Sequence, residues 1–61
     1  MVETMYYAVR DKEFYVETAI GIMRIQNMFE ASCFANVTEL IEFMQSYDIF
    51  EFDIYAVIRT I

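Results

Sequence analysis

Two kinds of side chain in this sequence could carry chemistry: the single thiol, Cys33, and the ten carboxylates. A thiol nucleophile needs a neighbouring base, and the chain has no histidine, so neither a Cys–His nor a Ser–His pair can form. Cys33 lies between Ser32 and Phe34, a setting more typical of a small buried hydrophobic residue than of a reactive thiolate. The sequence therefore predicts no catalytic residue at Cys33.

The carboxylates are better explained as a charged surface than as an acid–base pair. Glu51 and Asp53, and likewise Glu39 and Glu42, have no apolar setting that would tune them for proton transfer. A single glycine leaves no glycine-rich phosphate loop, and one cysteine without histidine excludes the usual zinc frameworks. We expect a protein that is not an enzyme and that binds no metal or cofactor.

The charge balance points to the kind of partner. Ten acidic residues against four basic ones give a formal charge of −6, which disfavours direct binding to nucleic acid or to a membrane and favours a protein with a basic surface. No unbroken apolar run, Ala19 to Met23 among them, is longer than five residues, far shorter than the roughly 20 residues of a membrane span. Without a recognisable leader, we expect a cytoplasmic protein with Cys33 reduced.

Hydrophobic periodicity predicts the elements that must position these residues. Residues 4–20 read as a β-hairpin: 4–10 is rich in aromatic and β-branched residues, 13–20 alternates, and Asp11-Lys12 has the length of a hairpin turn. Residues 21–35 are ambiguous. They have some helical spacing, but we favour strand two continuing past a bulge at Gly21, followed by a third strand near Ala31–Phe34.

The rest of the chain predicts one helix and one strand. Asn36 with Glu39 resembles a capping box, and the apolar spacing indicates a helix over 37–47, with a face made of Val37, Leu40, Ile41, Met44 and Tyr47. Residues 49–61 alternate as a final strand. The predicted fold is a single α+β domain over 1–61, ββ(β)αβ, with the helix on one face of a three- or four-stranded, mostly antiparallel sheet.

The uncovered face of that sheet is the predicted interaction surface. If Phe14, Val16 and Ile54 point at the helix, then tyrosines and carboxylates point away from it, and tyrosine is frequent at protein interfaces. The predicted partner-binding residues are Tyr6, Glu13, Tyr15, Glu17, Glu51, Asp53 and Tyr55. Ordinary cross-strand packing is the simpler alternative for exposed tyrosines on a sheet.

Two functions fit this pattern. The first is a protein–protein interaction module, most concretely a small acidic inhibitor that occupies a basic, nucleic-acid-binding surface, because carboxylates along strands can imitate phosphates. Small acidic proteins of phages and mobile elements, anti-CRISPR proteins among them, are similar in class, though not in sequence. The second is a homo-oligomeric structural protein, a homodimer or higher, whose tyrosine-bearing face pairs with its own copy, since a domain of about 60 residues has little stability to spare.

Overall fold

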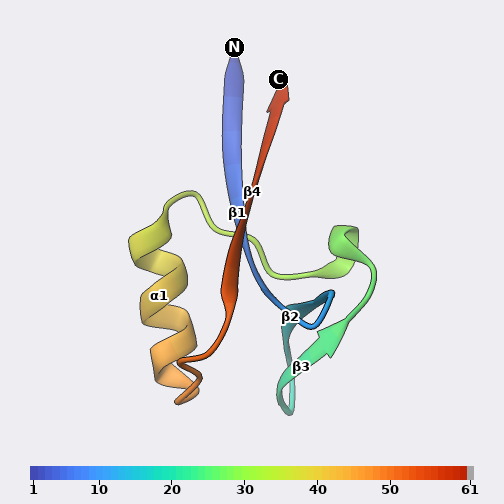
Figure 1. Ribbon diagram of the computed structural model, residues 1–61, viewed down its shortest axis with the longest axis vertical. Helices are drawn as coiled ribbons and strands as arrows, with labels where there is room; N and C mark the ends of the chain where they lie inside the picture. Colours follow the sequence, from blue (N-terminus) through green and yellow to red (C-terminus); the bar gives the residue numbers. More distant parts are fainter. Residues whose placement is uncertain (61) are drawn as a thin grey trace.

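The computed structural model describes residues 1–60 and confirms the α+β class (Figure 1). A four-stranded sheet has the order β3-β2-β1-β4, with every neighbouring pair antiparallel, and one helix packs against it. In chain order the elements are β1 (Val2–Arg10), β2 (Glu13–Thr18), β3 (Gly21–Ile25), the 3-10 turn η1 (Met28–Glu30), α1 (Val37–Ser46) and β4 (Asp53–Thr60).

The first hairpin forms where the sequence predicts it. Asp11 and Lys12 both have positive φ angles, 51° and 67°, as the two central residues of a type I′ turn require. This turn twists in the same sense as the strands that it connects. β1 and β2 pair only next to the turn, at Val9 with Phe14 and at Arg10 with Glu13, and they diverge beyond it.

Residues 21–35 contain a strand, a short 3-10 turn and an isolated bridge. β2 ends at Thr18, and β3 begins at Gly21, whose φ of 134° suits a residue without a Cβ. The Thr18 hydroxyl donates to the Gly21 carbonyl oxygen at 2.8 Å and fixes this second turn. The strand interpretation is therefore correct for 21–25. Gly21, however, is not a bulge within β2 but the first residue of β3, the second strand of a new hairpin.

The expected third strand near Ala31–Phe34 is reduced to a bridge that fills the gap between β1 and β2. Tyr6 and Phe34 exchange two backbone hydrogen bonds of 2.9 Å. The Ser32 N–H donates to the Tyr15 carbonyl oxygen at 3.2 Å, and the Ser32 hydroxyl oxygen accepts from the Glu17 N–H at 3.0 Å. These bonds satisfy backbone groups of β1 and β2 that the divergence would otherwise leave unpaired.

Both ends of α1 follow from local sequence. The Asn36 side chain accepts a hydrogen bond from the Glu39 N–H at 2.9 Å, which confirms the predicted N-cap. At the other end Asp48 has a φ of 57°, and the N–H of Ile49 donates to the Met44 carbonyl, the bonding pattern of a Schellman cap. Among residues 1–60, no helix is long and apolar enough to cross a membrane.

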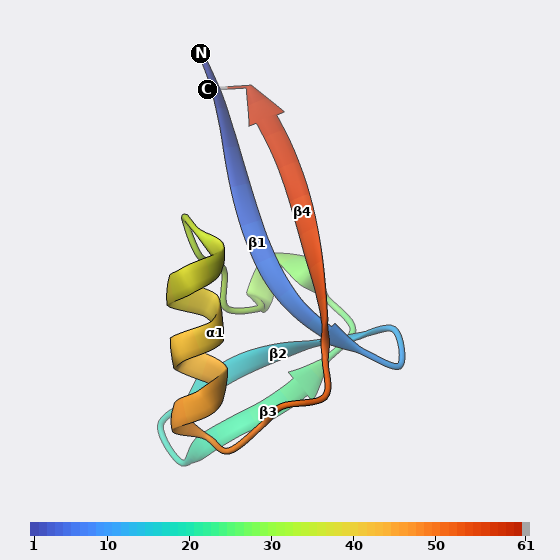
Figure 2. The same ribbon diagram turned by 60° about the vertical axis from the view of Figure 1, so that its left-hand side comes forward.

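β4 is shorter than predicted, because it begins at Asp53 rather than at Ile49. The connector before it still contributes to the core through Ile49 and Phe52. β4 pairs with β1 along its whole length, from Val9–Asp53 to Val2–Thr60. Figure 2 shows the result: the two strands extend past α1 as a two-stranded arm that carries both termini at one end.

Candidate protein interface

One face of the sheet, the side that α1 covers, holds the core. In the described part of the chain four side chains are buried: Ala8, Tyr15, Leu40 and Met44. Tyr6, Ile22, Phe34, Phe43, Ile49 and Phe52 pack around them. The prediction that Tyr6 and Tyr15 point away from the helix is therefore wrong, and Tyr15, only 7% exposed, is part of the core.

The face assignment is wrong because both faces of β1 carry apolar side chains, and on β2 the ring of Tyr15 is buried although two carboxylates flank it. Ala8 is small, which allows α1 to approach β1 closely, and the aromatic ring of Tyr15 fills the space beside it. Glu13 and Glu17 flank Tyr15 on the same face of β2, where their carboxylates reach polar partners at its margin. The predicted apolar face of the helix is also partly wrong. Ile41 was assigned to it but is 38% exposed, whereas Phe43 was not assigned to it but packs against the core.

The opposite face of the sheet carries an aromatic cluster that crosses three strands. Tyr7 of β1 lies edge-on to Phe14 of β2, with ring centroids 5.9 Å apart, and Phe14 lies edge-on to Tyr55 of β4 at 6.1 Å. Edge-to-face rings of this kind attract each other beyond the area that they bury. The strand register agrees, because Tyr7 pairs with Tyr55, and paired residues share a face.

We call this side the open face. It consists of the aromatic cluster with its apolar neighbours on β1 and β4, namely Met5, Tyr7, Val9, Phe14, Tyr55 and Val57. None of these side chains is buried, and Tyr55 is 51% exposed. Along the arm, β1 and β4 have no other element beside them in either view (Figures 1 and 2). The other five side chains are half-buried, so the face is apolar and partly exposed to solvent.

The predicted partner-binding residues do not form one surface. Of the seven, Asp53 and Tyr55 lie on the open face, as predicted for β4. Glu17 accepts a 2.7 Å hydrogen bond from the Tyr47 hydroxyl at the end of α1. Glu13 pairs with Arg24 at 3.8 Å, and Glu51, which precedes β4, pairs with Arg10 at 3.5 Å. Whether any of them binds a partner stays a prediction.

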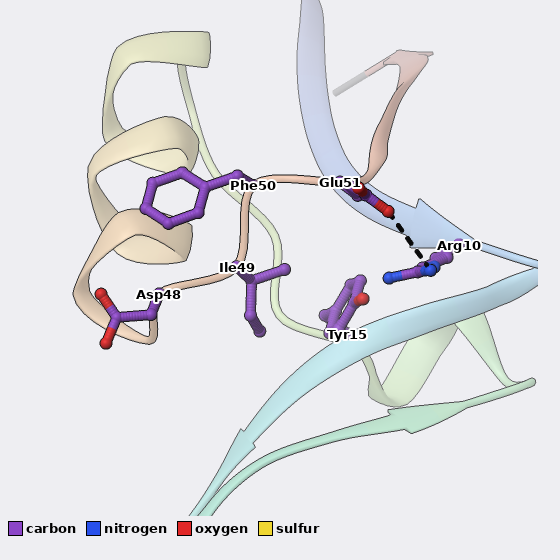
Figure 3. A pocket seen from close by; sticks show the side chains of 6 residues that line it. All are labelled: Arg10, Tyr15, Asp48, Ile49, Phe50 and Glu51. Atoms are coloured by element: carbon purple, nitrogen blue, oxygen red, sulfur yellow. Dashed lines mark ion pairs between the residues drawn. The ribbon is translucent and has the colours of Figure 1, made fainter.

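A shallow cleft of about 340 Å³ lies between the connector that joins α1 to β4 and the strands β1 and β2. Figure 3 shows Arg10, Tyr15 and Glu51 on one side of it, with Ile49, Phe50 and Asp48 along the connector. Its one cation already pairs with Glu51, and its polar side chains are exposed to solvent apart from Tyr15. The cleft therefore offers no set of groups poised for a reaction.

The two tyrosines with shifted pKa values lie on opposite faces. On the open face, burial raises the pKa of Tyr7 above the ordinary 10.0, and the adjacent Cys33 thiol adds to the rise. On the helix side, the hydrogen bond to the Glu17 carboxylate raises the pKa of Tyr47. Both hydroxyls stay protonated at neutral pH, so neither serves as a base.

Comparisons of the chain with protein-family models, with curated protein sequences and with solved structures find no match. Sequence reasoning missed Met5, Tyr7, Val9 and Phe14 as interface candidates. Tyr55 could have identified them. It was predicted to point outward, and a large aromatic residue that lies opposite it on a neighbouring strand must lie on the same face of the sheet.

Proposed function

We propose that this protein is a non-enzymatic protein–protein interaction module that acts through its open face. The aromatic cluster of Tyr7, Phe14 and Tyr55 is the observation that carries the proposal, because it gathers three rings on the face of the sheet that α1 does not cover. Tyrosine provides apolar contact area together with a hydrogen-bonding hydroxyl, which suits a surface that is wet when free and dry when bound.

The charge distribution supports the same surface. All three arginines pair with acidic side chains: Arg10 with Glu51, Arg24 with Glu13, and Arg59 with Glu3. The Arg59–Glu3 pair and Asp53 are the charges that the register places on the open face of β1 and β4. A surface of aromatic and aliphatic side chains with charge only toward its ends has the composition of an interface core with a polar rim.

A second candidate function uses the other side of the molecule. The solvent side of α1 carries Glu39 and Glu42 one turn apart, and Asp48 follows in the cap; all three are exposed. These carboxylates, with the net charge of −6, would attract a basic protein surface and speed association with it. The acidic inhibitor predicted from the sequence would therefore act through the helix rather than through the sheet.

Affinity capture with matched variants separates the two candidates. The immobilised chain, Tyr55→Glu on the open face and the double variant Glu39→Lys/Glu42→Lys on the helix would each be incubated with lysate of the native host and with an untagged copy of the chain. Retained proteins would be identified by mass spectrometry. All three positions are exposed, so circular dichroism should show the fold intact in every variant.

The proposal expects the retained proteins, the untagged copy included, to be lost from Tyr55→Glu and kept by the helix double variant. A buried interface cannot accept an unpaired carboxylate without a large loss of affinity. The opposite pattern, loss only from the helix variant, would reject the open face and select the acidic candidate.

A further inference from the structure

The outer edge of β4 is an unpaired strand edge. β4 is the last strand in the sheet order, so its eight residues pair with β1 on one side only. Seven of the eight are exposed, among them Ile58 at 71%. Figure 2 shows no element on the outer side of β4 along the arm. Every second residue therefore presents a backbone N–H and C=O to solvent.

β4 lacks the features that keep an edge strand from pairing with another chain. Proteins protect such edges with proline, lysine, a bulge or a very short strand. β4 has no proline, no lysine and no glycine, and its pairing with β1 runs without interruption from Asp53 to Thr60. Its only charged residues are Asp53 and Arg59, which lie near its two ends.

Strand geometry limits how two copies of β4 could pair. In an antiparallel ladder, a residue that directs its backbone groups outward must lie opposite another that does the same. Because backbone direction and side-chain direction both alternate every residue, open-face residues of one copy then lie opposite open-face residues of the other. The two open faces join on one side of an eight-stranded sheet, and the two helices lie on the other.

Charge selects one register among those that remain. When Ala56 lies opposite Ala56 of a second copy, Asp53 lies opposite Arg59, Ile54 opposite Ile58 and Tyr55 opposite Val57. Both charged residues of β4 then face their opposites, at each end of the ladder, and every apolar residue meets an apolar one. A shift by two residues in either direction separates Asp53 from Arg59: one shift places Arg59 opposite Tyr55, and the other places Asp53 opposite Val57.

We propose that two copies of this protein pair through β4, antiparallel and centred on Ala56, and that the joined open faces form the interaction surface. This inference rests on the proposed function and extends it: the second copy pairs along the β4 edge, and the joined sheet doubles the aromatic surface. Each copy has only four buried side chains among residues 1–60, so pairing with a second copy would stabilise each copy as well.

Cysteine pairs test the register directly. In a Cys33→Ser background, Ala56→Cys, Ile54→Cys and Ile58→Cys would each be oxidised mildly at equal concentration. Opposite residues have Cβ atoms about 5 Å apart, whereas residue 54 lies about 13 Å along the ladder from its own copy. All three positions are exposed, so the fold should tolerate them.

We expect Ala56→Cys to form a disulfide-linked dimer at least about tenfold faster than either other variant alone, because pairing raises the local thiol concentration. Ile54→Cys and Ile58→Cys should couple to each other when mixed. The Cys33→Ser chain alone should not cross-link. Equal rates for all three single variants, or fastest coupling of Ile54→Cys to itself, would overturn the register.

Sedimentation equilibrium of the unaltered, reduced chain completes the test, with a dimer mass expected at tens of micromolar. A monomer mass at every concentration would overturn the β4 pairing. It would leave the proposed function in place if Tyr55→Glu still lost foreign proteins in the capture experiment. Retention of every captured protein by Tyr55→Glu would overturn the proposed function, whatever the cross-linking result.

Discussion

The two faces of the sheet differ in what covers them more than in what they are made of. Tyr6, Ala8 and Tyr15 lie under α1, while Tyr7 and Phe14, their neighbours in sequence, lie on the open face. Both sets are apolar and aromatic. Hydrophobicity alone therefore does not decide which face of a small sheet becomes the core, because the placement of the helix decides it. The face left over stays an apolar surface, which we propose as the surface for a partner.

The largest expected difference between the faces is in tolerance of charge. Leu40→Asp should unfold the protein, because Leu40 is fully buried and an unpaired buried charge costs more than a small domain can lose. Tyr55→Asp should leave the fold intact, and so should Ile41→Asp, since Ile41 is 38% exposed. Circular dichroism during a thermal ramp measures this. Unfolding by Tyr55→Asp with a folded Leu40→Asp would reverse the face assignment.

The two tyrosines Tyr15 and Tyr55 provide a matched pair of smaller changes. Tyr15→Ala should lower the free energy of unfolding by about 3–5 kcal/mol, as removal of a buried aromatic ring does. Tyr55→Ala should lower it by less than about 1 kcal/mol, because the ring is half exposed and its loss leaves no cavity. Urea unfolding gives both values. Equal losses would mean that the open face is as much a core as the helix side.

Salt should affect binding at the two surfaces differently. Binding through the apolar open face should change little when sodium chloride is raised, whereas binding of a basic partner to Glu39 and Glu42 should slow down as charges are screened over about 10 Å. Surface plasmon resonance of a captured protein at low and high salt measures the association rate. A steep fall with salt that Glu42→Lys removes would favour the acidic helix surface.

The smallest expected difference concerns alkaline pH. The pKa values of Tyr7 and Tyr47 are raised in the folded protein, so their contribution to stability is complete below pH 10.0 and is lost as pH rises through the folded pKa values. Tyr7→Phe and Tyr47→Phe should each flatten the decline of the urea midpoint above that pH. A decline that both variants leave unchanged would assign the loss to other groups.

Local signals made part of the fold predictable from the sequence. Asn36 and Glu39 mark the start of α1, and Asp11-Lys12 marks a hairpin turn, because each depends on neighbouring backbone groups only. The side-chain directions along β4 were also predictable, since the charge of Asp53 marks one of the two alternating faces of the strand as the outward face.

Long-range features were not predictable. The choice between the two faces of β1 depends on where α1 packs, and nothing in the alternation of Tyr6, Tyr7, Ala8 and Val9 distinguishes those faces. The bridge between Phe34 and Tyr6 depends on the divergence of β1 from β2, which is a property of the folded sheet. The predicted placement of Glu13 and Glu17 on the uncovered face is wrong for the same reason, because α1 packs on the face that these residues share with Tyr15.

Hydroxyl-radical footprinting of the chain, free and in the complex recovered by affinity capture, tests the central claim most directly. If the partner binds the open face, oxidation of Tyr7 and Tyr55 should fall when the partner is bound, while oxidation of the exposed Ile41 and Phe50 stays unchanged. Protection of Ile41 and Phe50, with Tyr7 and Tyr55 oxidised as in the free chain, would contradict the claim that this protein acts through the open face of its sheet.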